Sequence, residues 1–481
     1  DANTQATADR FVLAGAGDDT LDAGLIGTVF QNFEEFSKEG TGTWRLTGTG
    51  SNDWKIAEGT LIGDSRSFGG NLDNAATVVF DQATDGSYDH VVSGNGTLIK
   101  RNAGTLALSA THTFTGETQV AAGTLQVDGV LPGAVTVASG ATLSGIGTVG
   151  RVSALAGGFV APGTAALPFG TLTIAGDYAG GGAVRINTVL GNDDSDTGRL
   201  LIQGNVSGTS RVLVERWSGN GARTRGDGIE IIKVDGSSAA DSFELGQTVQ
   251  AGAYQYLLYQ GGSADANDWY LRSELIDPNN PPDGEEPPTP AFRPGVPGYV
   301  LGHQANLEYG YTALGNLRAR VGDQGRVSVT GEAQAPSADA WMRVYAHELD
   351  VSGKRFAAQD LQMTTVQFGT DLYAQAAGKS STHFGVMASV GESRATLFDA
   401  ARAIGGLSTL AGEMETDAKG AGLYWTRFGA HGGYFDLSGQ LLHYSNRYRD
   451  LSLTTADQKG WSGTVAAEIG AVYALGASGW L

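Results

Sequence analysis

Three carboxylates in a glycine-rich stretch near the start of the chain could bind a metal ion. Residues 14–22 read AGAGDDTLD, which is close to the nonapeptide Gly-Gly-x-Gly-x-Asp-x-U-x of calcium-binding parallel β-helices. Calcium takes about six to eight oxygen ligands, so such a site needs carboxylates from stacked turns. The next turn, AGLIGTVFQNFEEF, lacks the pattern. Because only one copy of the pattern is present, a turn in which Asp18 and Asp19 cap backbone amides is favoured. Asp18, Asp19 and Asp22 are the calcium candidates of the less favoured alternative.

Two further short motifs have both a functional and a structural interpretation. Residues 193–198 read DDSDTG and resemble the start of an EF-hand loop, but the loop's glutamate is missing, which favours a turn. Arg225, Gly226 and Asp227 form the tripeptide that integrins bind, and they are an adhesion candidate. The same residues could instead form a turn before the strand IEIIKV.

Catalysis has little support in the sequence. The first 275 residues contain two histidines, His90 and His112, and no G-x-S-x-G elbow. Paired carboxylates for sugar cleavage stay open, because spacing along the chain does not give distance in space. Cysteine is absent, which removes disulfide and thiolate chemistry. We expect no enzymatic activity within this chain and no cofactor.

The length, net charge and composition of the chain limit its fold class and its partners. The chain has 481 residues, so two or more domains are expected. Its net charge of −20 disfavours a nucleic-acid partner, because phosphate binding needs a basic surface. No run of about 18 apolar residues predicts a membrane helix. The start, DANTQATADRFVL, has no signal peptide, which predicts a cytosolic chain or an interior piece of a longer one.

A loose repeat dominates residues 1–275. The tripeptide Gly-Thr-Leu recurs, and short apolar runs separated by turns surround it. A glycine turn followed by a short β run, repeated along the chain, is typical of a parallel β-helix or another β-solenoid. A β-sandwich is the alternative, although it would give more evenly spaced strands. The tripeptides begin at Gly59, Gly96, Gly104, Gly123 and Gly170.

A linker and a helix follow. Eight of the 12 prolines lie in residues 276–297, and proline at this density favours an extended linker. Residues 298–322 have helical spacing, with a seven-residue stripe and interspersed glycines that suit packing in a narrow space. The stripe consists of Val300, Leu307, Leu314 and Val321.

Residues 338–475 alternate with a period of two. Phe435 and Leu437 share one face of a predicted strand, and Asp436 and Ser438 share the other. We predict six strands of about ten residues, with aromatic ends and a polar face, as in a transmembrane β-barrel. The alternative is a soluble antiparallel sheet that packs on one side.

The order of these parts resembles the type Va autotransporters. The stretch TFTGETQVAAGTLQVDG is similar to an autotransporter-associated repeat. DDSDTGRLLIQGNVSG, with the strands after it, resembles the pertactin-like autochaperone, and AWMRVYAHELDVSG resembles the first strand of the β-domain. The predicted fold is all-β: a right-handed parallel β-helix, a helix and a partial antiparallel barrel. The predicted parts are a passenger segment (1–199), an autochaperone-like cap (200–275), a linker (276–297), a pore-spanning helix (298–322) and the first half of a barrel (335–481).

The resemblance implies export and display of an adhesin-like passenger by an outer-membrane barrel. Its implied partners are outer-membrane lipid, the barrel-assembly machinery, periplasmic chaperones and a host or cell-surface ligand. Its implied location is the outer membrane for the barrel and the cell surface or extracellular space for the passenger. The alternative function is a secreted β-helix that binds or cleaves polysaccharide.

The sequence also departs from the family pattern. Six strands are half of the family's about twelve, and the chain ends at GASGWL without the usual terminal aromatic residue. We therefore expect a fragment cut at both ends. Self-cleaving members carry an Asn-Asn pair in the helix, whereas this helix has only the isolated Asn306 and Asn316. Self-cleavage inside the barrel is therefore not expected.

Overall fold

The chain divides into two compact units where the sequence becomes proline-rich. The computed structural model describes residues 8–263, 265–277, 288–321 and 340–471. Among the described residues, one unit contains the chain up to Leu275 together with residues 288–291, and the other contains residues 276–277 and the chain from Phe292 onward. The predicted linker residues 278–287 and the predicted strand end after Ala471 lie outside the described residues.

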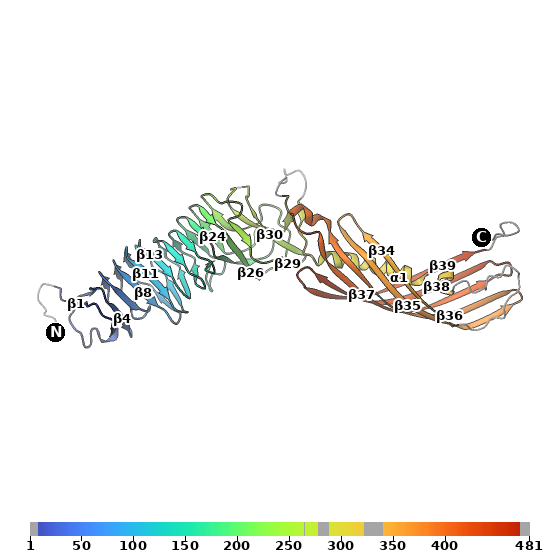
Figure 1. The fold of residues 1–481 in the computed structure, drawn as a ribbon, viewed down its shortest axis with the longest axis horizontal. Helices are drawn as coiled ribbons and strands as arrows, with labels where there is room; N and C mark the ends of the chain where they lie inside the picture. The colour runs from blue at the N-terminus through green and yellow to red at the C-terminus, as the bar shows by residue number, and fades with distance from the viewer. Residues whose placement is uncertain (1–7, 264, 278–287, 322–339, 472–481) are drawn as a thin grey trace. The chain divides into compact units, whose positions relative to one another are not determined.

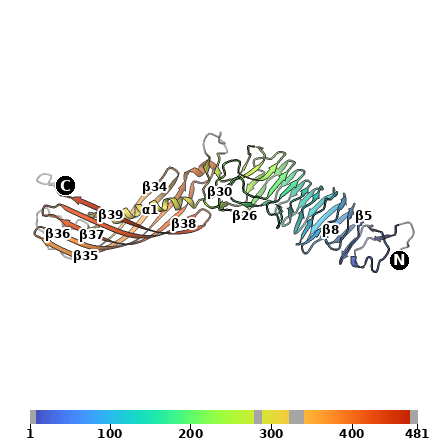
Figure 2. The same cartoon turned by 180° about the vertical axis from the view of Figure 1, so that it is seen from behind.

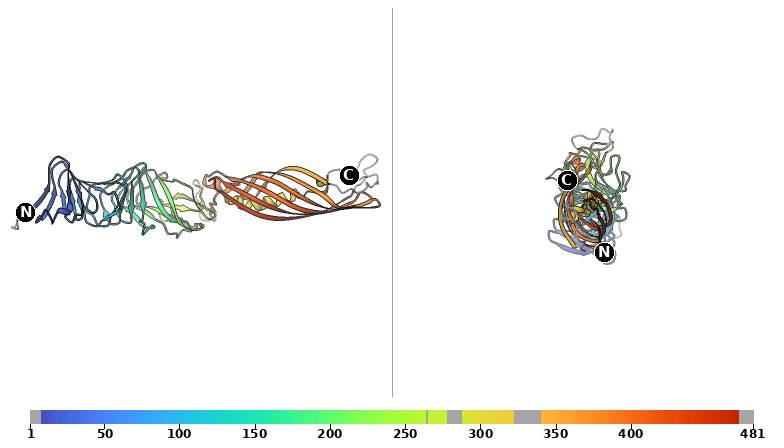
Figure 3. Two further views of the ribbon diagram at one scale, coloured as in Figure 1. Left: turned by 90° about the horizontal axis from the view of Figure 1, so that it is seen from below. Right: turned by 90° about the vertical axis from the view of Figure 1, so that its right-hand side faces the viewer.

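The first unit is a solenoid of short parallel strands that stack coil on coil (Figure 1; Figure 3, left). Its described strands form four main sheets. One has five strands: β1 (Arg10–Leu13), β3 (Glu35–Lys38), β5 (Trp54–Ile56), β7 (Leu72–Asn74) and β10 (Val92–Gly94). The second has ten: β2 (Asp19–Asp22), β4 (Thr43–Thr47), β6 (Thr60–Gly63), β8 (Thr77–Asp81), β11 (Thr97–Arg101), β13 (Glu117–Val120), β16 (Val135–Val137), β19 (Val152–Ala154), β22 (Tyr178–Gly180) and β25 (Val206–Gly208).

The other two sheets extend to the end of the solenoid. The third contains β9 (Gly86–Tyr88), β12 (Thr105–Leu108), β14 (Thr124–Val127), β17 (Thr142–Gly145), β20 (Phe159–Pro162), β23 (Ala183–Val189), β26 (Ser210–Ser218) and β28 (Phe243–Leu245). The fourth contains β15 (Val130–Leu131), β18 (Thr148–Val149), β21 (Thr171–Ile174), β24 (Arg199–Ile202), β27 (Ile229–Val234), β31 (Trp269–Arg272), β30 (Tyr254–Gln260) and β29 (Val249–Ala251). A 3-10 turn spans Ala23–Leu25, and β32 (Glu274–Leu275) pairs with β33 (Thr289–Pro290).

Each repeated Gly-Thr-Leu marks the start of a strand of the solenoid. Its threonine is the first strand residue, and its leucine points into the core. Register pairs Leu106 with Leu125 and Leu125 with Leu143, so inward leucines stack in a column. Each buried leucine contributes roughly 1.5–3 kcal/mol. The five tripeptide leucines, all fully buried, are Leu61, Leu98, Leu106, Leu125 and Leu172.

The C-terminal end of the solenoid changes to antiparallel pairing. β27 pairs antiparallel with β31, β31 with β30, and β30 with β29. Large side chains fill this end: Phe243 stacks near-parallel with Tyr178 and edge-on with Trp269. In the fourth sheet the antiparallel strands therefore pair the edge of β27, its last parallel strand.

The second unit is an antiparallel sheet in simple sequence order (Figure 2). Each strand pairs with the next along the chain, as expected for a meander. The strands are longer than the predicted ten or so residues. Among the described residues they are β34 (Ala340–Ser352), β35 (Phe356–Ala377), β36 (Ser380–Asp399), β37 (Leu410–Phe428), β38 (Tyr434–Asp450) and β39 (Thr455–Gly470).

The polarity of this sheet is inverted relative to a soluble protein. Leu441 is 62% exposed and Leu437 41% exposed, whereas Asp436, Ser438 and Gln440 are buried. The same alternation runs through the neighbouring strands, where Met342, Val344 and Val465 are all more than half exposed. A soluble sheet that packs on one side would bury its apolar face. The structure therefore confirms the alternating barrel-type pattern and disfavours the soluble alternative.

Helices are few in the described chain. Helix α1 (Val296–Leu314) starts with Pro297 in its first turn, where a missing N–H costs little. A short helix, α2 (Leu317–Val321), follows Gly315, whose φ is 61°. A 3-10 helix spans Ala400–Gly405. None of the helices in the described part of the chain is both long and apolar enough to cross a membrane.

One buried histidine makes the solenoid sensitive to acid. His112 is 1% exposed, and its Nδ1 accepts a hydrogen bond of 3.0 Å from the Val92 N–H. Nε2 has no hydrogen-bond partner among the described residues. Burial lowers the pKa of His112 to about 4. Because the unfolded chain titrates near 6.5, protons favour unfolding between these two values.

We therefore expect the stability that the neutral His112 confers to be present above about pH 6.5 and lost by about pH 4, up to about 3 kcal/mol. The measurement is the urea midpoint of the solenoid at pH 7.5 and 4.5 by circular dichroism. His112→Gln should flatten part of the pH dependence. His90→Gln, at an exposed position, is the control, and an equal effect of both variants would contradict the assignment.

Candidate functional site

Helix α1 lies against the polar face of the sheet (Figure 2). It contacts every one of the strands β34–β39. Two strand side chains donate hydrogen bonds to helix carbonyls: Gln440 Nε2 to Gly310 at 2.9 Å, and Tyr444 Oη to Asn306 at 2.8 Å. The carbonyls of the helix therefore provide hydrogen-bond acceptors for polar side chains that its packing buries.

Small residues let the helix approach the strands closely. A Cβ added at Gly298 or Gly302 would collide with the Tyr448 ring. In the other direction, Tyr309 projects from the helix over Gly391 of β36, where a Cβ would overlap its hydroxyl. That hydroxyl lies 2.6 Å from Thr365 Oγ1. The interspersed glycines of the helix thus serve packing in a narrow space, as predicted.

Charged side chains fix the C-terminal end of the helix. Arg343 of β34 donates to the carbonyls of Ala313 and Leu314 at 2.6 and 3.2 Å. A cation is favourable there, because the last carbonyls of a helix carry partial negative charge. Arg320 of α2 pairs with Asp436 of β38, and both side chains are almost fully buried. These contacts tie both helices to the inner face.

A hydroxyl, an imidazole and a carboxylate line up on the same face. His383 Nδ1 lies 2.8 Å from Asp371 Oδ2, and His383 Nε2 lies 3.2 Å from Ser381 Oγ. Such a chain can activate a hydroxyl for acyl transfer. However, the Asp371 carboxylate also accepts from the Tyr424 hydroxyl at 2.8 Å, and Ser381 lies within a ladder paired on both sides. With its neighbouring N–H groups used in pairing, this arrangement lacks an oxyanion site, and we interpret it as structural.

The predicted apolar stripe of the helix is not the face that packs on the sheet. Leu314 is buried, but Val300 is 53% and Leu307 37% exposed. The side chain of Val321 lies outside the described residues. The packed face instead combines glycines and alanines with a few large side chains, and the small residues let the helix approach the strands closely. Its buried members include Leu301, Ala305, Tyr309 and Ala313.

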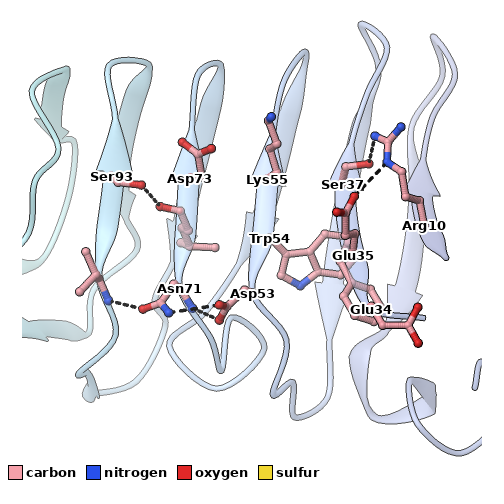
Figure 4. Close-up of a pocket in the computed structure, with 13 residues that line it drawn as sticks. Arg10, Glu34, Glu35, Ser37, Asp53, Trp54, Lys55, Asn71, Asp73 and Ser93 are labelled. Atoms are coloured by element: carbon pink, nitrogen blue, oxygen red, sulfur yellow. Dashed lines mark hydrogen bonds and ion pairs between the residues drawn. The ribbon is translucent and has the colours of Figure 1, made fainter. Parts of the chain in front are cut away.

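A groove of 810 Å³ crosses the five-stranded sheet of the solenoid (Figure 4). Its polar side chains mainly connect successive coils. The Asp53 carboxylate accepts from the Asn71 N–H at 2.7 Å, and Asn71 Oδ1 accepts from the Val91 N–H at 2.9 Å. Arg10 pairs with Glu35 at 3.5 Å. The described lining therefore indicates structural hydrogen bonding between coils and contains no arranged catalytic pair.

The calcium candidates do not form a ligand cluster. Asp22 Oδ1 caps the 3-10 turn by accepting from the Gly24 N–H at 3.0 Å, and Asp19 Oδ1 accepts from the Thr20 N–H at 2.7 Å. Asp18 is exposed. Within the part of the chain that the structure describes, no three His, Asp or Glu side chains are grouped to hold a metal ion. These contacts favour the turn interpretation.

The tripeptide at residues 225–227 is held as a turn. The Asp193 carboxylate accepts hydrogen bonds from the backbone N–H groups of Arg225, Gly226 and Gly228, at 2.8–2.9 Å. Burial alone would raise the pKa of Asp193, but these donors outweigh it and hold the pKa below its ordinary value. The Asp227 carboxylate is bonded to Ser263, so it is engaged within the protein.

Three family models match the chain. The Autotransporter beta-domain matches residues 340–481, and the Autochaperone Domain Type 1 matches residues 158–258. The Passenger-associated-transport-repeat matches residues 36–62 and 98–127. The chain belongs to the autotransporters. The solenoid is its passenger segment, and β34–β39 belong to its β-domain.

Relatives of this autotransporter include named adhesins. The Adhesin BmaC autotransporter of Brucella suis is 35% identical over 64% of this chain and 9% of its own length. The autotransporter adhesin AIDA-I of Escherichia coli is 43% identical over 22% of this chain and 8% of its own. An extracellular serine protease of Serratia marcescens is 43% identical over 19% of this chain and 8% of its own. The chain spans less than a tenth of each of these relatives.

Sequence reasoning missed two features of this autotransporter. The contact between Tyr309 and Gly391 joins residues far apart in the chain, and no periodic pattern in the sequence indicates it. The buried lysines Lys38 and Lys100 were also missed, although each stands four residues before a Gly-Thr pair, at Gly42 and Gly104. That shared spacing is a signal that could have found them.

Paired cysteines can test how helix α1 packs against the strands. A Cβ at Gly310 would lie 3.0 Å from Thr464 Oγ1, so we expect Gly310→Cys with Thr464→Cys to form a disulfide upon mild oxidation. Tyr311→Cys with Thr464→Cys is the matched control, because Tyr311 is 64% exposed on another face. The measurement is the gel mobility of the oxidised β-domain. Equal crosslinking of both pairs would contradict this packing.

Proposed function

We propose that this chain exports its own solenoid through its β-domain and displays it at the cell surface, where the solenoid acts as an adhesin. The inverted polarity of β34–β39 carries the proposal. An apolar face exposed on one side and a polar face covered by a helix on the other suit a wall between lipid and a wet lumen. The family matches support an outer-membrane location for the β-domain.

The adhesin role rests on the names of relatives. BmaC and AIDA-I are described as adhesins, and this chain shares part of its sequence with each. The partners that we propose are outer-membrane lipid, the barrel-assembly machinery, periplasmic chaperones and a cell-surface ligand. We assign no chemical reaction to the chain, and Arg225, Gly226 and Asp227 are a less favoured ligand contact, since Asp227 is already bonded.

The predicted division of the chain also enters the proposal. We propose that residues 200–275 act as the cap on which the coils of 1–199 fold, and that 276–297 link the cap to the pore helix. The autochaperone match, 158–258, overlaps this cap and begins earlier. The exposed Val300 and Leu307 would contact the part of the lumen wall that β34–β39 do not cover.

Cell fractionation tests the proposed function. In cells that express the full-length protein, we expect the β-domain in the outer membrane and the solenoid accessible to protease added outside intact cells. A protein found only in the culture supernatant, with no outer-membrane pool, would favour the alternative of a secreted β-helix that binds or cleaves polysaccharide. Intact solenoid after external protease treatment would exclude surface display.

A charge in the cap should reduce display. Leu258 packs partly buried against the solenoid core and pairs with Leu271. Leu258→Asp would bury a charge without a partner, so we expect display to fall at least about fivefold. Leu167→Asp is the control, because Leu167 is 55% exposed and lies in the same matched region. The measurement is the amount of solenoid at the cell surface relative to the amount of β-domain inserted in the membrane. Unchanged display would show that export does not require a correctly folded cap.

A further inference from the structure

Two lysines of the solenoid are fully buried. Lys38 ends β3 and Lys100 lies in β11, and both are 0% exposed. Lysine is rarely buried, because removing an ammonium from water is costly unless it is hydrogen-bonded. Burial lowers the pKa of Lys100 to about 8, so this ammonium is still mostly charged at neutral pH. Such side chains need a specific set of acceptors.

Backbone carbonyls surround the first ammonium. Lys38 Nζ donates to the carbonyls of Glu39 at 3.0 Å and Gly40 at 2.6 Å, which form the corner that follows its own strand. Its third bond, at 3.1 Å, goes to the carbonyl of Glu58. Glu58 lies between β5 and β6, in the coil that comes next along the chain.

The second ammonium repeats this arrangement at another corner. Lys100 Nζ donates to the carbonyls of Asn102, at 2.6 Å, and Gly104 in its own coil. The third bond, at 2.9 Å, again goes to the next coil, to the carbonyl of Ala122 between β13 and β14. An ammonium has three donors, and both lysines use all of them.

The backbone around each lysine is shaped for this contact. A glycine follows the acceptor of the next coil in both cases, Gly59 with φ 68° and Gly123 with φ 66°. A Cβ at Gly59 would lie 2.7 Å from Lys38 Nζ, and one at Gly123 would lie 2.5 Å from Lys100 Nζ. Any other residue would both strain the turn and displace the ammonium.

The two sites coincide with the two matched repeats. Residues 36–62 contain Lys38 and Gly59, and residues 98–127 contain Lys100 and Gly123. Two residues after each lysine the backbone is left-handed, with φ 74° at Gly40 and φ 67° at Asn102. The repeat thus carries a lysine, a left-handed corner and a glycine turn in the next coil as one unit.

The contacts have a direction along the chain. Each lysine bonds its own coil and the coil that follows it, and among the described residues neither bonds the coil that precedes it. The three donors are satisfied only when the following coil is already in place. We propose that Lys38 and Lys100 are positioning residues that dock each coil onto the next coil along the chain.

The proposal predicts an asymmetric effect of removing one ammonium. Without Lys100, the coil of β10–β12 keeps its strand ladders to the coil of β13–β15 but loses its side-chain attachment to it. Every coil before it is then attached less firmly. The coils after it keep their own contacts with the cap. A lysine that only filled space in the core would loosen both sides to a similar extent.

Hydrogen exchange on the full-length protein in outer-membrane vesicles can measure this asymmetry. In Lys100→Met we expect exchange to accelerate at least about tenfold in β8 and β11 and to stay unchanged in β16 and β17. Lys55→Met is the matched control, because Lys55 lies exposed on the outer face of β5 and should change neither side. Equal acceleration on both sides, or none, would overturn the proposal.

A second variant guards against loss of folding. Lys100→Gln keeps a buried donor group without the charge, so it should give a smaller effect with the same direction, and a symmetric effect would overturn the proposal. The link to export rests on the proposed function and has its own readout. Slower surface display of Lys38→Met and Lys100→Met would support both the docking role of the lysines and its link to export. Asymmetric exchange with normal display would leave the docking role intact and show that export does not depend on this contact between coils.

Discussion

Backbone hydrogen bonds between neighbouring strands are the interaction on which the rest of this chain depends. In the parallel part of the solenoid, the described strands pair with strands of the coil before or after them, whereas at the C-terminal end β29 and β30 pair with each other as a hairpin. An unpaired N–H or C=O group away from water costs free energy comparable to a lost hydrogen bond. The same requirement holds for β34–β39, where each strand supplies the ladder of the next.

The two units satisfy this requirement with opposite side-chain distributions. In the solenoid, leucines, valines and aromatic rings fill a continuous inner column, and polar residues such as Thr105 and Thr124 lie outside. In the sheet, Asp371, Gln367 and Gln440 are buried while Leu423 and Ile469 are exposed. The backbone pairing is common to both, and only the surroundings of each face differ. One chain therefore carries one unit suited to water and one suited to lipid.

Local patterns predicted most of this architecture, and long-range packing explains what they missed. The Gly-Thr-Leu repeat and the period-two alternation are local, so the solenoid and the sheet could be predicted from them. The packed face of the helix could not. Val300 and Leu307 belong to the periodic apolar stripe, yet the glycines at 298 and 302 decide which face approaches Tyr448. The buried lysines went unrecognised because lysine is normally a surface residue.

The register of the leucine columns bears on how such a chain can change its length. Leu106, Leu125 and Leu143 align because each coil adds a complete set of strands and corners. An insertion of one residue within a strand would turn every later side chain of that strand to the other face. Addition or loss of a whole coil leaves all remaining columns intact. Selection can therefore lengthen or shorten this rod in coil-sized steps, and smaller insertions are tolerated only at its corners.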